Sequence, residues 1–111
     1  MLLDALSAHG MHYTTVIVQD NYDVPGPGEF STGLMGVRIT DRNAILARTD
    51  LPTDELKLTN AQAARYRHIG SVRALAGQVS INDSWLSVDA KIRGESVRCI
   101  TTHLLGPVLP L

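Results

Sequence analysis

Apolar and polar residues alternate on both sides of an Arg-Gly-Glu-Ser turn in Leu86–Leu104 (LSVDAKIRGESVRCITTHL). A period of two predicts strands, and glycine supplies the positive φ of a tight hairpin turn. We take Gly94-Glu95 as a two-residue loop of type II′, with glycine in its first position. The pairs that follow are Ile92 with Val97, Ala90 with Cys99, Val88 with Thr101 and Leu86 with His103.

One face of this hairpin is the predicted core face, and His103 lies on it at the open end. Its members are Leu86, Val88, Ala90, Ile92, Val97, Cys99, Thr101 and His103. The opposite face carries Trp85, Ser87, Asp89, Lys91, Ser96, Arg98, Ile100 and Thr102. A histidine at that rim either caps the core edge with a hydrogen bond or reaches a substrate as a titratable group. Spacing alone does not choose between these roles.

The N-terminal half of the chain predicts a helix followed by strands. Residues 1–9 place leucines at helical spacing, and Gly10 follows where a left-handed C-terminal cap belongs. Tyr13–Gln19 is rich in β-branched residues without strict alternation, which predicts a strand covered on both faces. Val37–Arg48 predicts a second strand, and the polar interruption at Asp41-Arg42-Asn43 indicates a bulge or a tight bend.

The glycine- and proline-rich segment Asp20–Gly36 predicts a long irregular loop. It does not predict a phosphate cradle, because Pro27 lacks an N–H where a cradle needs successive donors.

Leu56–Thr59 alternates as a strand does, whereas Asn60–Ile69 fits either a continued strand or a helix. Gly77–Ile81 predicts a further strand, and Asn82-Asp83-Ser84 predicts the turn after it.

Composition limits the classes of function. The 111 residues form one domain or part of one, and the net charge of -1 provides no global field for nucleic acid or an anionic membrane. The single cysteine excludes an intramolecular disulfide and a cysteine-rich zinc cluster. No apolar run is long enough to span a bilayer, and we see no targeting signal. The most basic stretch, Arg65–Arg73, has Tyr66 as its only aromatic, so a solvated polar face is favoured over a nucleic-acid patch.

Four segments resemble the endonuclease/exonuclease/phosphatase family, the fold shared by DNase-I-like nucleases, sphingomyelinases and inositol-polyphosphate phosphatases. They are Leu2–Tyr13 (LLDALSAHGMHY), Val37–Arg48 (VRITDRNAILAR), Trp85–Asp89 (WLSVD) and Arg93–Leu104 (RGESVRCITTHL). The last is the most specific, and together they span nearly the whole chain. The resemblance implies an α+β fold: part of a DNase-I-like layered β-sandwich, with mostly antiparallel strands and an N-terminal helix. Residues 1–111 are then a single partial domain of this family.

The same resemblance implies a chemistry. In the family, the histidine that matches His103 binds or protonates the scissile phosphate, and Mg²⁺ polarises the phosphoryl oxygen. Thr101 and Cys99 depart from the usual Asn and Phe, and Asp83-Ser84 from the usual Arg-Gly. The segments that carry the family's metal ligands and base are expected outside these residues. Asp41, Asn43 and Asp89 are the remaining polar candidates, and we assign no metal to them.

These observations favour a partial Mg²⁺-dependent phosphoesterase that acts on a phosphate ester of a nucleic acid, lipid or sugar, with little or no hydrolysis by this chain alone. A sandwich cut through its middle leaves sheet edges unpaired, which predicts self-association. The alternative is a non-catalytic β-rich module that binds nucleic acid or protein through a sheet edge or the Arg65–Arg73 stretch. A third reading is a fragment from a truncated reading frame with no selected function.

Overall fold

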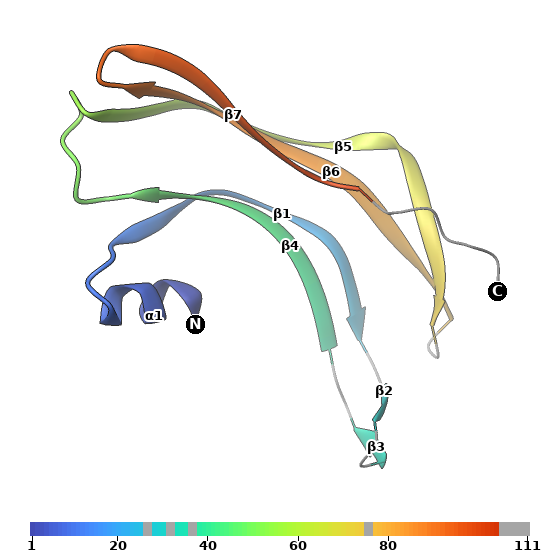
Figure 1. Ribbon diagram of the computed structural model, residues 1–111. Coiled ribbons are helices and arrows are strands. Elements are labelled where there is room, and N and C mark those ends of the chain that lie inside the picture. Colours follow the sequence, from blue (N-terminus) through green and yellow to red (C-terminus); the bar gives the residue numbers. More distant parts are fainter. Residues whose placement is uncertain (26–27, 31–32, 36–37, 75–76, 105–111) are drawn as a thin grey trace.

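Strands make up most of the described chain. The computed structural model describes residues 1–25, 28–30, 33–35, 38–74 and 77–104, and Figure 1 shows their arrangement. The elements are α1 (Leu2–Ala8), β1 (Tyr13–Pro25), β2 (Gly28–Phe30), β3 (Gly33–Met35), β4 (Arg38–Arg48), β5 (Leu56–Ala74), β6 (Gly77–Ile92) and β7 (Glu95–His103). All described strand pairs are antiparallel, so the predicted β-rich fold with an N-terminal helix is confirmed at this level.

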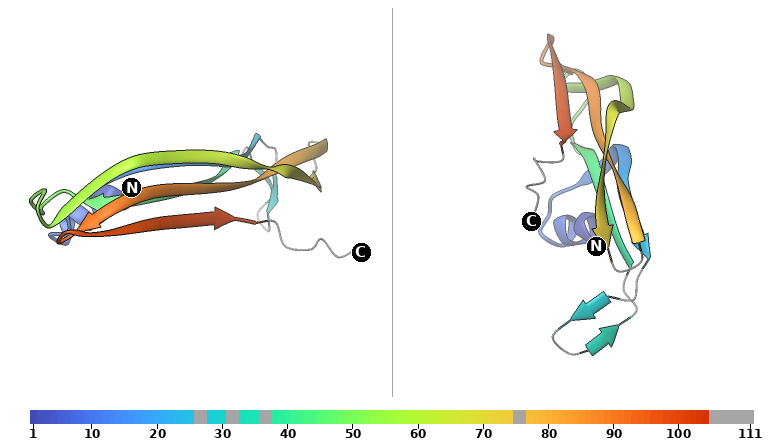
Figure 2. Two further views of the ribbon diagram at one scale, coloured as in Figure 1. Left: turned by 90° about the horizontal axis from the view of Figure 1, so that it is seen from above. Right: turned by 90° about the vertical axis from the view of Figure 1, so that its right-hand side faces the viewer.

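Two sheets lie face to face. One contains β1 and β4, the other has the order β5-β6-β7, and a small β2-β3 ribbon extends from the first. In Figure 1 the α1 helix lies on the side of β1-β4 that faces away from the other sheet, and the views in Figure 2 show the two layers from above and from the side. The molecule is elongated, with extents of 52 × 36 × 18 Å. No helix among the described residues is long and apolar enough to cross a membrane.

The core lies between the sheets and is centred on β6. Leu86, Val88 and Ala90 of β6 and Ala47 of β4 are buried, and Ile17 and Ile45 are half-buried beside them. The sheet surfaces that face outward are less covered. Val18 of β1 is 48% exposed, so the prediction that this strand is covered on both faces is wrong.

The predicted helix and its glycine cap are confirmed. Gly10 has a φ of +76°, the Met11 N–H donates to the Leu6 carbonyl at 2.9 Å, and the Gly10 N–H donates to the Ser7 carbonyl at 2.9 Å. This is the Schellman pattern, which satisfies carbonyls at the helix end.

The hairpin has the predicted faces but a different register. Arg93 and Gly94 form the loop, with φ values of 48° and 88°, so the turn is of type I′ and not II′. The observed pairs are Ile92 with Glu95, Ala90 with Val97, Val88 with Cys99, Leu86 with Thr101 and Ser84 with His103. The shift is two residues, and an even shift leaves each side chain on its predicted face. His103 therefore pairs with Ser84, two residues before its expected partner Leu86.

Asp20–Gly36 is not the predicted long loop. The β1-β4 ladder continues to the pair Pro25–Arg38, and β2 and β3 pair with each other. Cross-strand polar contacts support the extension: Arg42 contacts Asp20 at 2.7 Å, and both Arg38 and Thr40 donate to Asp23. Residues 26–27, 31–32 and 36–37 lie outside the described part.

The ambiguous stretch Asn60–Ile69 is strand, because it lies in β5, which pairs with β6. The β5-β6 ladder has two register shifts, one between Thr59 and Gln62 and one between Arg65 and Ile69. Asn60 takes a φ of 54° at the first shift, a conformation that asparagine tolerates. The predicted strand Gly77–Ile81 is confirmed as part of β6. The turn predicted at Asn82-Asp83-Ser84 is wrong, since β6 runs through these residues.

Candidate functional site

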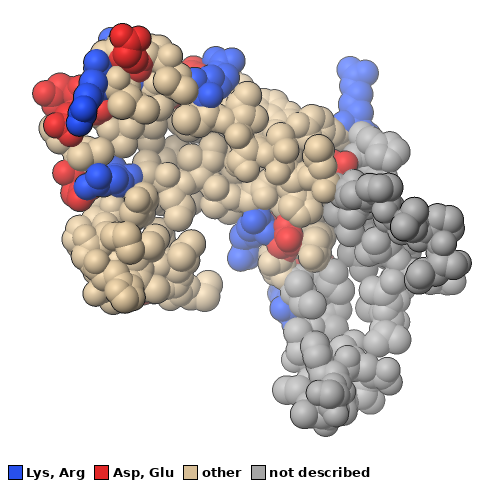
Figure 3. Space-filling view, in the orientation of Figure 1, with Lys and Arg blue, Asp and Glu red and all other residues tan. Residues whose placement is uncertain are grey.

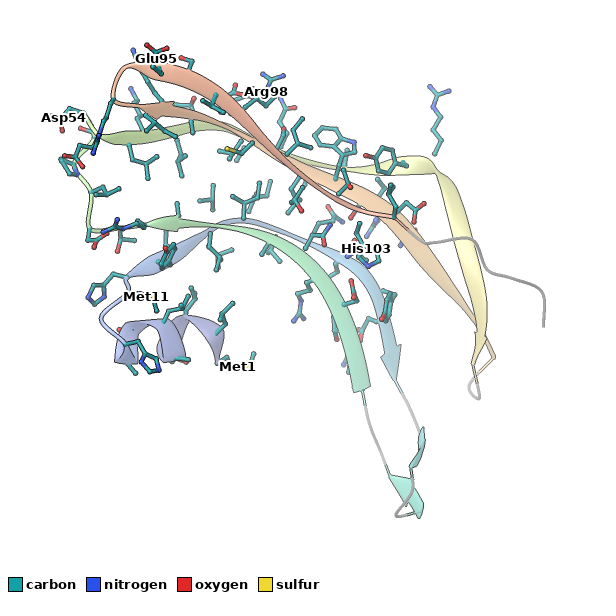
Figure 4. All side chains as sticks on the ribbon, in the orientation of Figure 1. Met1, Met11, Asp54, Glu95, Arg98 and His103 are labelled. Atoms are coloured by element: carbon teal, nitrogen blue, oxygen red, sulfur yellow. The ribbon has the colours of Figure 1, made fainter. Side chains whose placement is uncertain are left out.

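The inter-sheet layer changes from apolar to polar along its length. On the inner face of β4, Ala47 and Ile45 belong to the apolar part, whereas Asn43 and Asp41 follow toward the other end. His103 enters this polar end from β7, and Figure 4 shows its side chain between the two sheets. The candidate site is therefore the polar end of the sandwich.

A β-bulge supplies the central residue of this site. Asp20 pairs with Arg42 and Tyr22 with Asp41, so Asn21 is an extra residue in β1. The sequence predicted a bulge or bend at Asp41-Arg42-Asn43, whereas the extra residue lies in β1, opposite Asp41 and Arg42. A bulge re-aims a side chain relative to regular alternation. Here the Asn21 side chain is fully buried between the sheets.

Asn21 joins β6 to β4 through its carboxamide. The Ser84 hydroxyl donates to Asn21 Oδ1, and Asn21 Nδ2 donates to Asp41 Oδ1 at 2.7 Å. Asn82 Nδ2 also donates to the Asn21 backbone carbonyl, at 3.3 Å. Both ends of the carboxamide are thus satisfied, as burial requires.

His103 meets the same carboxylate oxygen. His103 Nε2 lies 3.3 Å from Asp41 Oδ1, and the two side chains are 28% and 30% exposed. A neutral imidazole can donate Nε2–H to this oxygen, and an imidazolium forms an ion pair with it. Ser84, Asn21, Asp41 and His103 therefore form one connected network across four strands, which we call the Asn21 network.

Two buried nitrogen atoms near this network have no hydrogen-bond partner among the described residues: His103 Nδ1 and Asn43 Nδ2. Buried polar atoms without partners are uncommon and costly. Nδ1 is the ring nitrogen that is not directed at Asp41, so a substrate can reach it only if the ring or its cover moves.

The other candidate acidic residue lies elsewhere. Asp89 is on the opposite face of β6, as predicted, where it accepts hydrogen bonds from Arg98 at 2.7 Å and Asn60 at 3.0 Å. The Arg98 guanidinium and then the Asn60 carboxamide hold the pKa of Asp89 at about 2, below its ordinary value. Within the described residues, no group of three or more His, Cys, Asp or Glu side chains is placed to hold a metal ion.

A second surface feature lies on the outer face of β5-β6-β7. A groove of about 290 Å³ is lined by Gln62, Tyr66, Trp85, Ser87, Arg98 and Ile100. The register pairs Ala64 with Trp85, which brings the tryptophan near Tyr66 from a distant part of the sequence. Arg65 and Arg67 beside Tyr66 are exposed. The side chains of His68 and Arg73 lie outside the described part.

Charged side chains are unevenly distributed over the molecule. In the view of Figure 3, cations and anions gather at the end that carries the β6-β7 turn, whereas the middle of the molecule is largely without charge.

The sequence predicted His103 as a site residue and offered Asp41 only as a polar candidate without a role, and it missed Asn21 and Ser84. Asn21 lay in an expected loop and Ser84 in an expected turn. The available signal was the run of polar residues around Asn21 opposite Asp41-Arg42-Asn43, which two paired strands with a shared bulge would produce.

Comparisons with protein-family models, with curated proteins and with solved structures give no match to this chain. The resemblance to the endonuclease/exonuclease/phosphatase family therefore stays a prediction.

Replacement of Asn21 by alanine tests the network. Asn21→Ala removes a donor to Asp41 and the acceptor of the buried Ser84 hydroxyl, so we expect it to lower the free energy of unfolding by roughly 3 kcal/mol. Gln19→Ala is the matched control on the same strand, because Gln19 makes only a long 3.4 Å bond to the neighbouring Asp20 carbonyl. Urea unfolding followed by Trp85 fluorescence measures both. Equal losses in the two variants would contradict the network.

Proposed function

We propose that this chain forms the phosphate-binding part of a Mg²⁺-dependent phosphoesterase of the endonuclease/exonuclease/phosphatase type, with His103 at the phosphate. The observation that supports this proposal is the contact of His103 with Asp41, held by the buried Asn21 carboxamide. A carboxylate beside an imidazole restrains the orientation of the ring, and a restrained ring suits a group that meets a phosphate.

The positions of His103, Asp41 and Asn21 indicate the role of each side chain in the proposed phosphate binding. His103 donates to a phosphate oxygen or protonates the leaving oxygen. Asp41 orients the ring through its contact with Nε2. Asn21 is a positioning residue, because it contacts Asp41 and not the substrate. Because Nδ1 is buried, phosphate binding requires the His103 ring to turn or its cover to move.

The described residues do not fit a Mg²⁺ site. Mg²⁺ prefers several oxygen ligands in octahedral geometry, whereas Asp41 is the one carboxylate of the network and its Oδ1 already accepts from Asn21. We therefore derive no step through a metal and expect little or no hydrolysis by this chain alone. The substrate class within the phosphate esters stays open.

Phosphate binding at His103 tests the proposal. Inorganic phosphate is added to the chain while the ¹⁵N and ¹H signals of the four histidine rings are followed by NMR. We expect the His103 signals to shift with phosphate, and binding to weaken at least about tenfold in His103→Ala through loss of a charge-assisted hydrogen bond. His9→Ala is the matched control, since His9 is exposed at the end of α1.

The contrary outcomes are distinct. Phosphate that leaves the His103 signals unchanged, or that binds His103→Ala as well as the parent chain, contradicts the proposed role. Turnover of bis(4-nitrophenyl) phosphate with Mg²⁺ that is lost in His103→Ala supports that role but overturns the expectation that the chain is inactive alone.

A second candidate function rests on the outer groove. We infer that a non-catalytic module of this shape would bind single-stranded nucleic acid there. The sequence offered only one aromatic in the basic stretch, but the β5-β6 register adds Trp85 to Tyr66. Aromatic rings stack with bases, and the exposed Arg67 next to Tyr66 suits a phosphate.

Fluorescence anisotropy with a labelled oligo(dT) tests this candidate. We expect Tyr66→Ala to weaken binding about tenfold through loss of one stacked base. The variant Arg67→Gln should lower the slope of log affinity against log salt by roughly 1. Lys57→Gln, on an exposed residue at the far end of β5, is the control. Binding that is independent of salt and of Tyr66, or binding of proteins but not oligonucleotides, excludes this candidate.

A further inference from the structure

The β7 strand is an open sheet edge. Among the described residues, its nine residues pair only with β6, and Figure 2 shows the strand at the rim of its sheet. Other edge strands of the described chain carry irregularities: the β1-β4 ladder has two register shifts, and the β5-β6 ladder has two. The β6-β7 ladder runs without a shift from Glu95 to His103. A regular edge of this kind, free of bulges and proline, is a template for another strand.

Apolar surface accompanies this edge on both faces of the sheet. Val97 is 48% exposed on the inner-face side, and Ile100 is 63% exposed on the outer side. The one cation within the strand, Arg98, is engaged by Asp89 of the same sheet at 2.7 Å. Arg98 therefore opposes pairing of this edge with another strand less than a free charge would.

We propose that the occupant of this edge is β7 of a second copy of the chain, paired antiparallel about a two-fold axis at Cys99. The two three-stranded sheets then form one continuous sheet. This inference does not depend on the proposed phosphoesterase function.

Hydrogen-bond geometry restricts the register. Ile92 and Glu95 flank a two-residue loop, where flanking residues form a hydrogen-bonded pair. Because such pairs alternate along an antiparallel ladder, the odd-numbered residues of β7 bond to β6. The even-numbered residues direct their N–H and C=O groups outward: Ser96, Arg98, Ile100 and Thr102. Hydrogen bonds between the two copies form only when even-numbered residues of one β7 lie opposite even-numbered residues of the other. The two-fold axis must therefore lie where one residue faces the same residue of the second copy.

The remaining registers differ in whether like charges oppose each other and in how many residues of β7 are paired. An axis at Arg98 places two guanidinium groups opposite each other, which is unfavourable. An axis at Ile100 leaves Glu95 and Ser96 unpaired. An axis at Cys99 pairs the whole strand and opposes no like charges. Its pairs are Glu95 with His103, Ser96 with Thr102, Val97 with Thr101, Arg98 with Ile100 and Cys99 with Cys99.

This register also brings a residue of the second copy to the Asn21 network. Glu95 of the second copy lies directly opposite His103, on the face of the sheet where His103 meets Asp41. Opposed side chains in such a pair have Cβ atoms about 4.5–5.5 Å apart, so a carboxylate there is within reach of the imidazole. The pairing therefore adds a second anion beside His103.

Disulfide formation between the Cys99 residues of two copies tests the register of the two β7 strands directly. Opposed residues of a non-hydrogen-bonded pair have Cα atoms about 4.5 Å apart, within the range that a disulfide spans. We expect diamide, which takes up the two thiol hydrogens, to convert the chain into a covalent dimer. The variant Cys99→Ser/Val97→Cys should not link to itself, because residue 97 faces residue 101. It should link when mixed with Cys99→Ser/Thr101→Cys.

The backbone requirement has its own test. Ile100→Pro removes an outward N–H while leaving the β6-β7 ladder its donors, and Ile100→Thr removes the apolar surface but keeps that N–H. Light scattering during size-exclusion chromatography should give a concentration-dependent dimer for the parent chain and for Ile100→Thr, and a monomer for Ile100→Pro. A parent chain that stays monomeric, a dimeric Ile100→Pro, or equal self-linking through residues 97 and 99 would overturn the proposal.

Discussion

The fully buried carboxamide of Asn21 holds the polar end of this sandwich together. It accepts from Ser84 of one sheet and donates to Asp41 of the other, and Asp41 then meets His103. Removing this group would leave the buried Ser84 hydroxyl without its acceptor and Asp41 without one donor, a costly change. The bulge in β1 exists in this account because regular alternation would direct residue 21 elsewhere.

The apolar part of the layer and the polar network have complementary roles. Leu86, Val88 and Ala90 hold β6 against the β1-β4 sheet, and the same strand continues through Ser84 into the network. Burial supplies most of the attraction between the sheets, since it scales with the apolar area removed from water. The hydrogen bonds add specificity, because the observed registers place Ser84 and Asp41 at the two ends of the Asn21 carboxamide. The packing of β6 against the β1-β4 sheet and the contact with Asp41 together fix the position of His103.

Local sequence patterns correctly predicted the structural features that depend on neighbouring residues. They failed for features that depend on pairing with strands distant in the sequence. The helix ends where Gly10 allows a left-handed cap, and the hairpin faces follow from alternation alone. The loop type at Arg93-Gly94 was misjudged because both Gly94-Glu95 and Arg93-Gly94 place glycine in a turn. Asn60–Ile69 has helix formers, yet it is strand because β6 supplies its hydrogen-bond partners. The Asn21 network could not be derived at all, since a bulge depends on the register of two strands.

A double-mutant cycle between Asp41 and His103 measures whether their side chains interact. The free energies of unfolding of the parent chain, Asp41→Asn, His103→Ala and the double variant are compared. If the Asn21 network extends to His103, the two replacements are coupled by about 0.5–3 kcal/mol, because the side chains meet at 3.3 Å. Additive effects would show that the two side chains do not interact and that the network ends at Asp41.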